Sequence, residues 1–339
     1  MLQAVNHERL PQDVRVTTGA FLAEPGPADR GSARSSKSFD PEPLVSQLQG
    51  RRVSVCIPAR DEAATVGEIV TTVVSSLTSG GGGVPLVHEV LVVDDGSRDG
   101  TARVAEEAGA RVVAPDGGGH DPAGTSPRTR AEASTTDTPT AVGAPPTAVG
   151  TRSGFGGKGQ AMRAGLDAAV GDLVVFLDGD VSNFHAGFVT GLLRPLLADE
   201  TVLLVKGFYD RPLDGRPGEG GRVTELVARP VIELLFPDLL GVRQPLAGET
   251  AAPRWVLEKC GLDDGYAVEL GLLVDVLAHF GPEVIAQVDL GVRVHRNRPL
   301  DELRPQATDI LRAALVRRGY RAPGSADGWQ GPPLTVADG

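Results

Sequence analysis

The chain has 339 residues and a formal net charge of -11 at pH 7, which gives it enough length for one large domain or two. An acidic chain lacks the basic face that binds nucleic acids and anionic membranes, so we expect neither as a partner. Two cysteines, Cys56 and Cys260, give no disulfide framework and no zinc set, and they suit a reducing compartment. The polar first ten residues, and the lack of a run of roughly 18–20 apolar residues, predict a cytoplasmic protein without membrane insertion.

The first half of the chain alternates strand and helix patterns after an irregular start. Residues 1–42 carry no periodicity and predict a flexible arm. Beyond them the hydrophobic pattern predicts strands over 52–59, 89–93, 110–113, 173–177 and 201–209, and helices over 65–77, 99–109, 157–169 and 188–197. Strands that alternate with helices in this way are typical of right-handed βαβ units in a parallel sheet.

The rest of the chain contains an irregular insertion and a second set of elements. Residues 115–156 are dominated by Gly, Pro, Thr, Ser and Ala and predict a disordered insertion in a surface loop or lid. The pattern predicts helices over 230–240, 265–277 and 300–320, a strand over 284–290, and a loop or short strand at 244–249. The Gly/Pro-rich residues 321–339 predict a flexible tail.

Two acids follow the apolar strand at 173–177. Asp178 and Asp180 are one residue apart, so on an extended chain their side chains point the same way. Neighbouring carboxylates repel unless a cation lies between them, and hard divalent cations prefer oxygen ligands. The alternative interpretation is a strand followed by a solvated acidic turn. Acids also follow the strands at 52–59 and 89–93, and ligands of open α/β sheets bind at the carboxyl ends of the strands.

The order of these strand ends resembles the front half of the GT-A glycosyltransferases, over about residues 50 to 210. Blocks at 220–230, 244–249, 265–275 and 286–300 resemble the actinobacterial glucosyl-3-phosphoglycerate synthases, and the resemblance covers roughly 50 to 315 apart from the insertion. It implies an α/β GT-A fold with a Rossmann-like, mixed and mostly parallel sheet flanked by helices. It also implies a nucleotide-sugar-binding half at 43–212 and a half for acceptor binding and dimerisation at 213–320.

The same resemblance implies a reaction. A retaining glucosyltransferase of this family moves glucose from a nucleotide donor, usually UDP-glucose, to the 2-hydroxyl of 3-phosphoglycerate, and feeds glucosylglycerate or methylglucose lipopolysaccharide synthesis. It acts as a homodimer with Mg²⁺ or Mn²⁺, whose charge offsets that of the departing diphosphate. Asp180 and His295 match the metal ligands. A lone histidine is more often a core or surface residue, so the role of His295 depends on the family blocks around it.

Further roles follow residue by residue from the resemblance. Asp178 and Glu269 match catalytic residues. The residues matched to the nucleotide sugar are Pro58, Ala59, Arg60, Asp61, Glu62, Asp95, Ser97, Lys158, Asp178, Gly179, Leu246, Gly248, Glu269 and Arg293. The residues matched to the acceptor are Gly221, Arg222, Val223, Thr224 and Asn297. A solvated Lys158 on a mobile loop and a plain helix cap at Thr224 are the alternative interpretations.

The chain departs from the family pattern at two places. Arg60 and Asp61 stand where an apolar residue and an amide are expected, which predicts an altered nucleotide preference, and Gly179 replaces an expected serine with a mild effect. The alternative functions are a mannosyl-3-phosphoglycerate synthase, another soluble GT-A glycosyltransferase, a nucleotidyltransferase, and an inactive dimer that senses sugar nucleotides. Because the sequence shows no convincing nucleophile, it favours front-side attack over a covalent intermediate as the route to retention.

Overall fold

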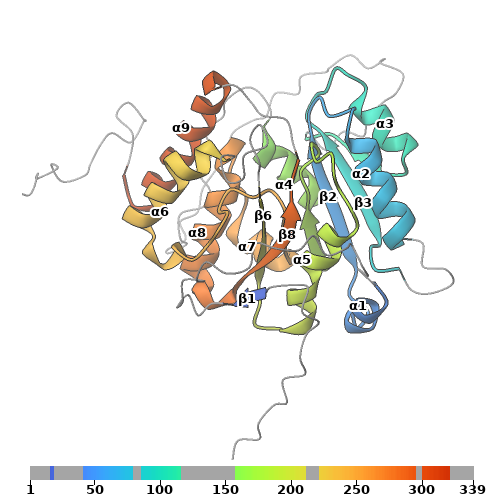
Figure 1. Ribbon diagram of the computed structural model, residues 1–339, viewed down its shortest axis with the longest axis horizontal. Coiled ribbons are helices and arrows are strands. Elements are labelled where there is room, and N and C mark those ends of the chain that lie inside the picture. Colours follow the sequence, from blue (N-terminus) through green and yellow to red (C-terminus); the bar gives the residue numbers. More distant parts are fainter. Residues whose placement is uncertain are drawn as a thin grey trace, which may run out of the picture.

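One mixed sheet organises the part of the chain that the structure describes. The computed structural model describes residues 16–18, 41–78, 85–115, 157–210, 221–294 and 300–320. Within these ranges eight strands form a single sheet in the order β1-β8-β6-β7-β5-β2-β3-β4, and helices lie on both of its faces (Figure 1). The α/β fold with a mostly parallel sheet that the sequence predicts is therefore confirmed.

The first half of the chain supplies the parallel side of the sheet. Its strands are β2 (Val53–Ala59), β3 (Glu89–Asp94), β4 (Arg111–Val113) and β5 (Leu173–Phe176). All four run parallel, and Val55 on β2 pairs with Val90 on one side and Val175 on the other. Val55 and Cys56 are both buried, but they belong to the two different apolar cores that flank the sheet. Burial on both faces explains why these strands are almost continuously apolar in sequence.

The second half extends the same sheet. Its strands are β6 (Leu204–Asp210), β7 (Thr250–Pro253) and β8 (Ile285–Val292). β7 lies between β5 and β6 and is antiparallel to both, whereas β8 is parallel to β6. β1 (Val16–Thr18) pairs antiparallel with β8, so a short strand lies within the arm that the sequence predicts to be flexible. Neither β1 nor β7 was expected from the sequence pattern.

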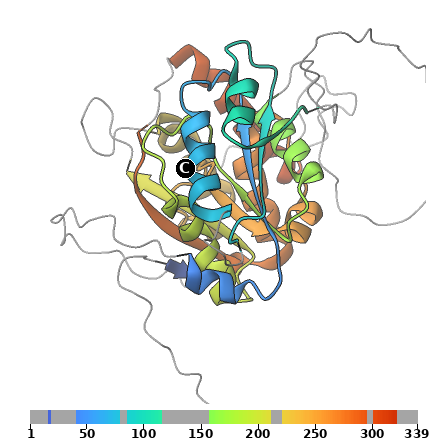
Figure 2. The same cartoon turned by 90° about the vertical axis from the view of Figure 1, so that its right-hand side faces the viewer.

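Helices cover the two faces as two separate layers. One layer contains α1 (Glu42–Gln47), α2 (Val66–Val73), which a π-helical turn extends over Val74–Thr78, α3 (Thr101–Glu107) and α5 (Gly187–Ala198). The other contains α4 (Lys158–Ala168), α6 (Arg229–Leu235), α7 (Arg254–Cys260), α8 (Val268–Phe280) and α9 (Leu300–Arg317). Figure 2 looks onto the face that α2 and α3 cover.

Short helical turns connect these elements. They are the π-helical turn Thr224–Ala228 and the 3₁₀ turns Pro237–Leu239, Gly265–Ala267 and Pro282–Val284. Helix α7 has no counterpart in the elements expected from the sequence. The predicted insertion at 115–156, beyond its first residue, and the predicted tail at 321–339 lie outside the described residues. No helix in the described ranges is long and apolar enough to cross a bilayer.

Candidate functional site

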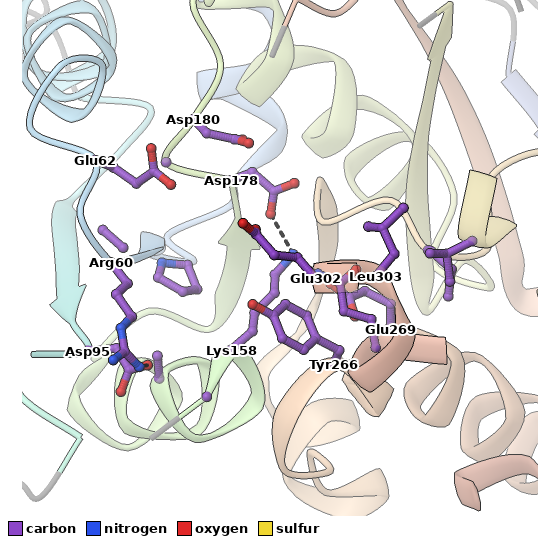
Figure 3. Close-up of a pocket in the computed structure, with 18 of the residues that line it drawn as sticks. Arg60, Glu62, Asp95, Lys158, Asp178, Asp180, Tyr266, Glu269, Glu302 and Leu303 are labelled. Carbon is purple, nitrogen blue, oxygen red and sulfur yellow. Dashed lines mark hydrogen bonds and ion pairs between the residues drawn. The ribbon is translucent and has the colours of Figure 1, made fainter. Parts of the chain in front are cut away.

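A cavity of about 540 Å³ opens at the carboxyl ends of β2, β3 and β5, where the sequence predicts a ligand site. Figure 3 shows Arg60 and Asp95 on one side of it, Tyr266 and Glu269 on the other, and Lys158 between them. The described residues that line it are Pro58, Ala59, Arg60, Asp61, Glu62, Asp95, Gly157, Lys158, Ala161, Asp178, Gly179, Asp180, Gly221, Arg222, Val223, Thr224, Leu246, Tyr266, Glu269, Arg293, Glu302, Leu303, Gln306 and Ile310.

Lys158 lies between two carboxylates at the centre of the cavity. Its Nζ atom is 2.5 Å from Asp178 Oδ1 and 2.5 Å from Glu269 Oε1, and its side chain is 20 % exposed. Burial by itself would lower the pKa of Lys158, but the two carboxylates outweigh it and raise the pKa above its ordinary value. Lys158 is therefore a cation at every physiological pH. The solvated lysine considered as an alternative does not fit these contacts.

Glycines allow the backbone to approach this centre. A Cβ atom on Gly159, in the first turn of α4, would collide with the carbonyl oxygen of Asp263. A Cβ atom on Gly248, in the loop before β7, would collide with the carboxylate of Asp178. Gly179 is different, because its nearest neighbours would lie at ordinary contact distances of 3.4 to 3.6 Å from an added Cβ. The serine expected from the family pattern would thus fit at 179.

Arg293 brings a second cation to the two aspartates. Its side chain is 3 % exposed, with Nη1 at 2.8 Å from Asp178 Oδ2 and Nη2 at 2.5 Å from Asp180 Oδ1. Burial would lower the pKa of Arg293, but Glu249, Tyr209 and the two aspartates raise it well above its ordinary value. Asp178 is shared between Arg293 and Lys158, and this holds its carboxylate in a fixed orientation.

Three buried polar side chains support the cavity without lining it. Tyr209 and Glu249 are 3 % and 0 % exposed, and the Tyr209 hydroxyl donates a hydrogen bond of 2.8 Å to Glu249 Oε2. Lys206, on β6, donates to the carbonyl oxygen of Ala247 at 2.5 Å and to Thr250 Oγ1 at 2.9 Å. Burial lowers the pKa of Lys206 to about 8, although nearby carboxylates act in the opposite direction. No sequence pattern indicated these three roles.

Hydrogen bonds tie the loop after β2 to the loop after β3. The backbone N–H of Asp61 donates to Ser97 Oγ at 2.9 Å, and Asp61 Oδ1 accepts from the backbone N–H of Arg98 at 2.8 Å. Asp61 has a φ of 56°, a left-handed conformation that Asp and Asn adopt more readily than other non-glycine residues. The acid at this position therefore shapes the loop as well as lining the cavity.

Arg60 and Asp95 form an ion pair across the same two loops. Arg60 Nη1 lies 3.5 Å from Asp95 Oδ2, with side-chain exposures of 53 % and 11 %. Burial raises the pKa of Asp95 above its ordinary value, and Arg60 counteracts this in part. The pair gives this end of the cavity a charged surface where the family pattern predicts an apolar residue at 60.

The segment Gly221–Thr224 lines the cavity directly before the π-helical turn Thr224–Ala228. Gly221 has a φ of 85°, which favours glycine, and Thr224 is buried at 6 % exposure. Arg222 is half-buried and lines the cavity, so one segment brings a guanidinium and a hydroxyl to the cavity wall.

Most residues matched to the site by sequence reasoning meet at this one cavity. Of the matched residues that the structure describes, only Ser97 and Gly248 do not line it: Ser97 binds the loop of Asp61, and Gly248 lies against Asp178. His295 and Asn297 lie outside the described residues. The lining residues outside the matched set are Gly157, Ala161, Tyr266, Glu302, Leu303, Gln306 and Ile310. Four of these share one face of α9, a spacing that helical periodicity could have revealed.

The donor atoms at the cavity wall fit a hard divalent cation in part. Asp178 and Asp180 both line the cavity and offer carboxylate oxygens, the ligands that Mg²⁺ and Mn²⁺ prefer. In the ranges that the structure describes, no three His, Cys, Asp or Glu side chains gather closely enough to hold a metal ion. A cation here would thus need further ligands, from His295 or from the bound substrate.

Comparisons with known proteins show what the whole chain is similar to. The model of Glycosyl transferase family 2 matches residues 54–121. Glucosyl-3-phosphoglycerate synthase of Mycolicibacterium paratuberculosis is 40% identical over 304 residues, which cover 87% of this chain and 80% of that protein. The crystal structure of glucosyl-3-phosphoglycerate synthase from Mycobacterium tuberculosis in complex with Mn²⁺, UDP-glucose and phosphoglyceric acid matches with a TM-score of 0.67 at 37% identity, over 86% of this chain and 88% of that one.

The same Mycobacterium tuberculosis enzyme with Mg²⁺ and UDP gives a TM-score of 0.67 at 37% identity, over 85% of this chain and 86% of that one. The identity to the Mycolicibacterium enzyme extends over most of both chains. The chain therefore belongs to the glucosyl-3-phosphoglycerate synthase family, as its sequence blocks predict.

Proposed function

We propose that this chain is a metal-dependent, retaining glucosyltransferase that moves glucose from UDP-glucose to the 2-hydroxyl of 3-phosphoglycerate. The observation that carries the proposal is the arrangement of one cavity. The loops after β2 and β3 line one part of it, the Asp178–Asp180 turn lines the middle, and the Gly221–Thr224 segment lines another part. The Mycobacterium tuberculosis relative, at 37% identity, has been crystallised with Mn²⁺, UDP-glucose and phosphoglyceric acid together.

On the donor side, the proposal assigns the nucleotide to the loops around Pro58–Glu62 and Asp95. It assigns the diphosphate to Arg293 and to a cation at Asp180. A divalent cation held by Asp180 and His295 would stabilise the negative charge of the departing diphosphate. Val294, which precedes His295, supports this ligand pair because its carbonyl oxygen accepts from the backbone N–H of Ser182 at 3.1 Å, two residues after Asp180. Arg293 would donate to the same diphosphate from the buried side.

On the acceptor side, Arg222 and Thr224 would bind the phosphate of 3-phosphoglycerate, with Asn297 beside them. The glucose would then lie between Leu246 and Glu269, near Lys158. Lys158 keeps Asp178 and Glu269 oriented, so the sugar meets carboxylates whose positions are fixed before it binds. We favour front-side attack, in which a donor phosphate oxygen accepts the proton of the acceptor hydroxyl. A Glu269→Gln variant with full activity would remove Glu269 from any catalytic role.

The test combines purified protein, 3-phosphoglycerate and a panel of nucleotide sugars, with and without a chelator. We expect release of UDP from UDP-glucose, only when both acceptor and divalent cation are present, and retention of the α configuration by nuclear magnetic resonance of the product. Release of GDP from GDP-mannose alone would instead identify a mannosyl-3-phosphoglycerate synthase. Metal-dependent binding of UDP-glucose without any turnover would identify a sensor.

The proposal extends to the compartment and the assembly. Both cysteines are free, which suits the cytoplasm, where thiols stay reduced. Leu226 and Leu234, on the π-helical turn Thr224–Ala228 and on α6, are 72% and 79% exposed, which suits a protomer that buries them in a homodimer. Light scattering during size-exclusion chromatography tests the dimer, and a monomer at micromolar concentration would contradict it.

A further inference from the structure

Arg293 lies between two groups of side chains, and only one group reaches the cavity. On the cavity side it contacts Asp178 and Asp180 at 2.8 and 2.5 Å. On the inner side its Nη1 donates a hydrogen bond of 2.6 Å to the Tyr209 hydroxyl and lies 3.4 Å from Glu249 Oε1. Tyr209 and Glu249, which we name the inner pair, are buried and do not line the cavity. They cannot touch a substrate there.

The chemistry of the inner pair fixes the direction of its hydrogen bonds. A phenol has one proton to donate, and Tyr209 donates it to Glu249 Oε2 at 2.8 Å. The lone pairs of the hydroxyl therefore accept from Arg293, whose guanidinium can only donate. Glu249 orients the hydroxyl and also places a negative charge behind the guanidinium. Burial strengthens both effects because the local dielectric constant is low.

The contact of Arg293 with Asp180 conflicts with the proposed cation site. The carboxylate that Arg293 contacts is the one we assign as a metal ligand. Two positive groups at one carboxylate repel each other, so a cation at Asp180 weakens the hold of Arg293 on that carboxylate. The inner pair offers the guanidinium a second anchor at that moment, because it lies on β6 and directly before β7 and does not depend on Asp180.

We propose that Tyr209 and Glu249 are positioning residues that hold Arg293 when a divalent cation takes Asp180. The inference rests on the proposed function, which supplies the cation. Without the inner pair, Arg293 would depend on Asp178 and Asp180 alone and would compete more strongly with the cation. With the inner pair, the guanidinium stays at the cavity wall, where it can donate to an anionic oxygen of the donor.

The test measures Mn²⁺ binding by the full chain without nucleotide sugar or acceptor, by calorimetry and by electron paramagnetic resonance. Tyr209→Phe keeps the ring and removes the hydroxyl, and we expect the Mn²⁺ dissociation constant to rise about threefold to tenfold, the effect of one net hydrogen bond. Glu249→Gln should act in the same direction. The KM for UDP-glucose should rise more than kcat falls. Thr190→Val, which removes a buried hydroxyl on α5 outside the cavity lining, is the matched control and should change neither quantity.

The proposed effect depends on the guanidinium. In an Arg293→Lys background, whose compact ammonium cannot contact both groups at once, Tyr209→Phe should no longer change the Mn²⁺ dissociation constant. Unchanged Mn²⁺ binding in Tyr209→Phe, or an equal change with and without the guanidinium, would overturn the inference. If Glu249→Gln fails to fold, Tyr209→Phe decides the question. If the unsubstituted protein transfers no glucose to 3-phosphoglycerate but the variants change Mn²⁺ binding as expected, only the proposed function is contradicted. An unsubstituted protein that binds no Mn²⁺ would contradict both the function and the inference.

Discussion

The cavity has two regions that are held together by different forces. The loops after β2 and β3 form the proposed nucleotide region, and the side chains around Lys158 and Arg293 form the centre. At the nucleotide region, hydrogen bonds between exposed loops and one half-exposed ion pair fix Asp61, Ser97 and Arg60. At the centre, a partly exposed lysine and a buried arginine bind shared carboxylates at 2.5 to 2.8 Å. Exposed pairs contribute little to stability, whereas removal of one partner of a buried pair costs much. The nucleotide region should therefore tolerate substitution, and the centre should not.

The largest effect is expected for Lys158→Met at the centre. The substitution leaves Asp178 and Glu269 without their shared cation, and we expect the free energy of unfolding to fall by about 3 kcal/mol, the lower end for buried pairs because the lysine is partly exposed. Urea denaturation measures this change. Arg103→Ala removes the exposed pair with Glu107 and serves as the control, with an expected change below about 0.5 kcal/mol. Equal losses in the two variants would contradict the contrast between the central ion pairs and exposed ones.

The substitution Asp180→Asn tests the centre of the cavity through its effect on the rate of UDP release. An amide keeps the size of the side chain but removes the charge that we propose holds the cation, and we expect kcat with Mn²⁺ to fall by about 100-fold to 1,000-fold. Steady-state assays of UDP release measure it. Asp61→Asn is the matched control, because it also lines the cavity and an amide can keep the left-handed conformation and the bond from Arg98. A similar loss in both variants would show that any acid in the cavity matters equally.

Lys206 adds a pH dependence to the centre. Its pKa is about 8 in the folded chain against 10.5 for an ordinary lysine, so between these values the unfolded chain binds more protons. The free energy of unfolding should therefore rise with pH across this window, by up to about 3 kcal/mol, and the burial penalty should be fully present below pH 8. Urea denaturation of the unsubstituted protein and of Lys206→Met from pH 7 to 10 gives the free energy of unfolding of each. The difference between the two pH profiles is the contribution of Lys206. Parallel pH profiles would show that Lys206 titrates normally.

The smallest effect is expected at the nucleotide region. Arg60→Leu restores the apolar residue of the family pattern, and we expect the preference in kcat/KM for UDP-glucose over GDP-glucose to rise about threefold to tenfold. Stability should stay within about 0.5 kcal/mol because the pair with Asp95 is half exposed. Arg98→Leu, whose side chain does not line the cavity, is the control. A loss of stability instead of a change of preference would contradict the assignment of Arg60 to the nucleotide.

The sequence could predict the parallel side of the sheet because β2, β3 and β5 are apolar runs that end in acids. It missed β7, because Thr250–Pro253 is short, contains two alanines and ends in proline, and only its neighbours β5 and β6 make it a strand. At the site, the resemblance to the family assigned Lys158, Asp178 and Arg293 to one binding site from the sequence alone. Tyr209 and Lys206 were missed because their roles arise from tertiary contacts beneath the cavity, and single polar residues in an apolar strand carry no periodic signal.

The glycine at 248 also offers a way to sort unfamiliar sequences. Because the backbone at this position lies directly against Asp178, the side chain of any larger residue would collide with the aspartate and push the loop away from it. A related chain that keeps Asp178 and Asp180 but carries a side chain at 248 is expected to lack the sugar transfer that we propose for this one.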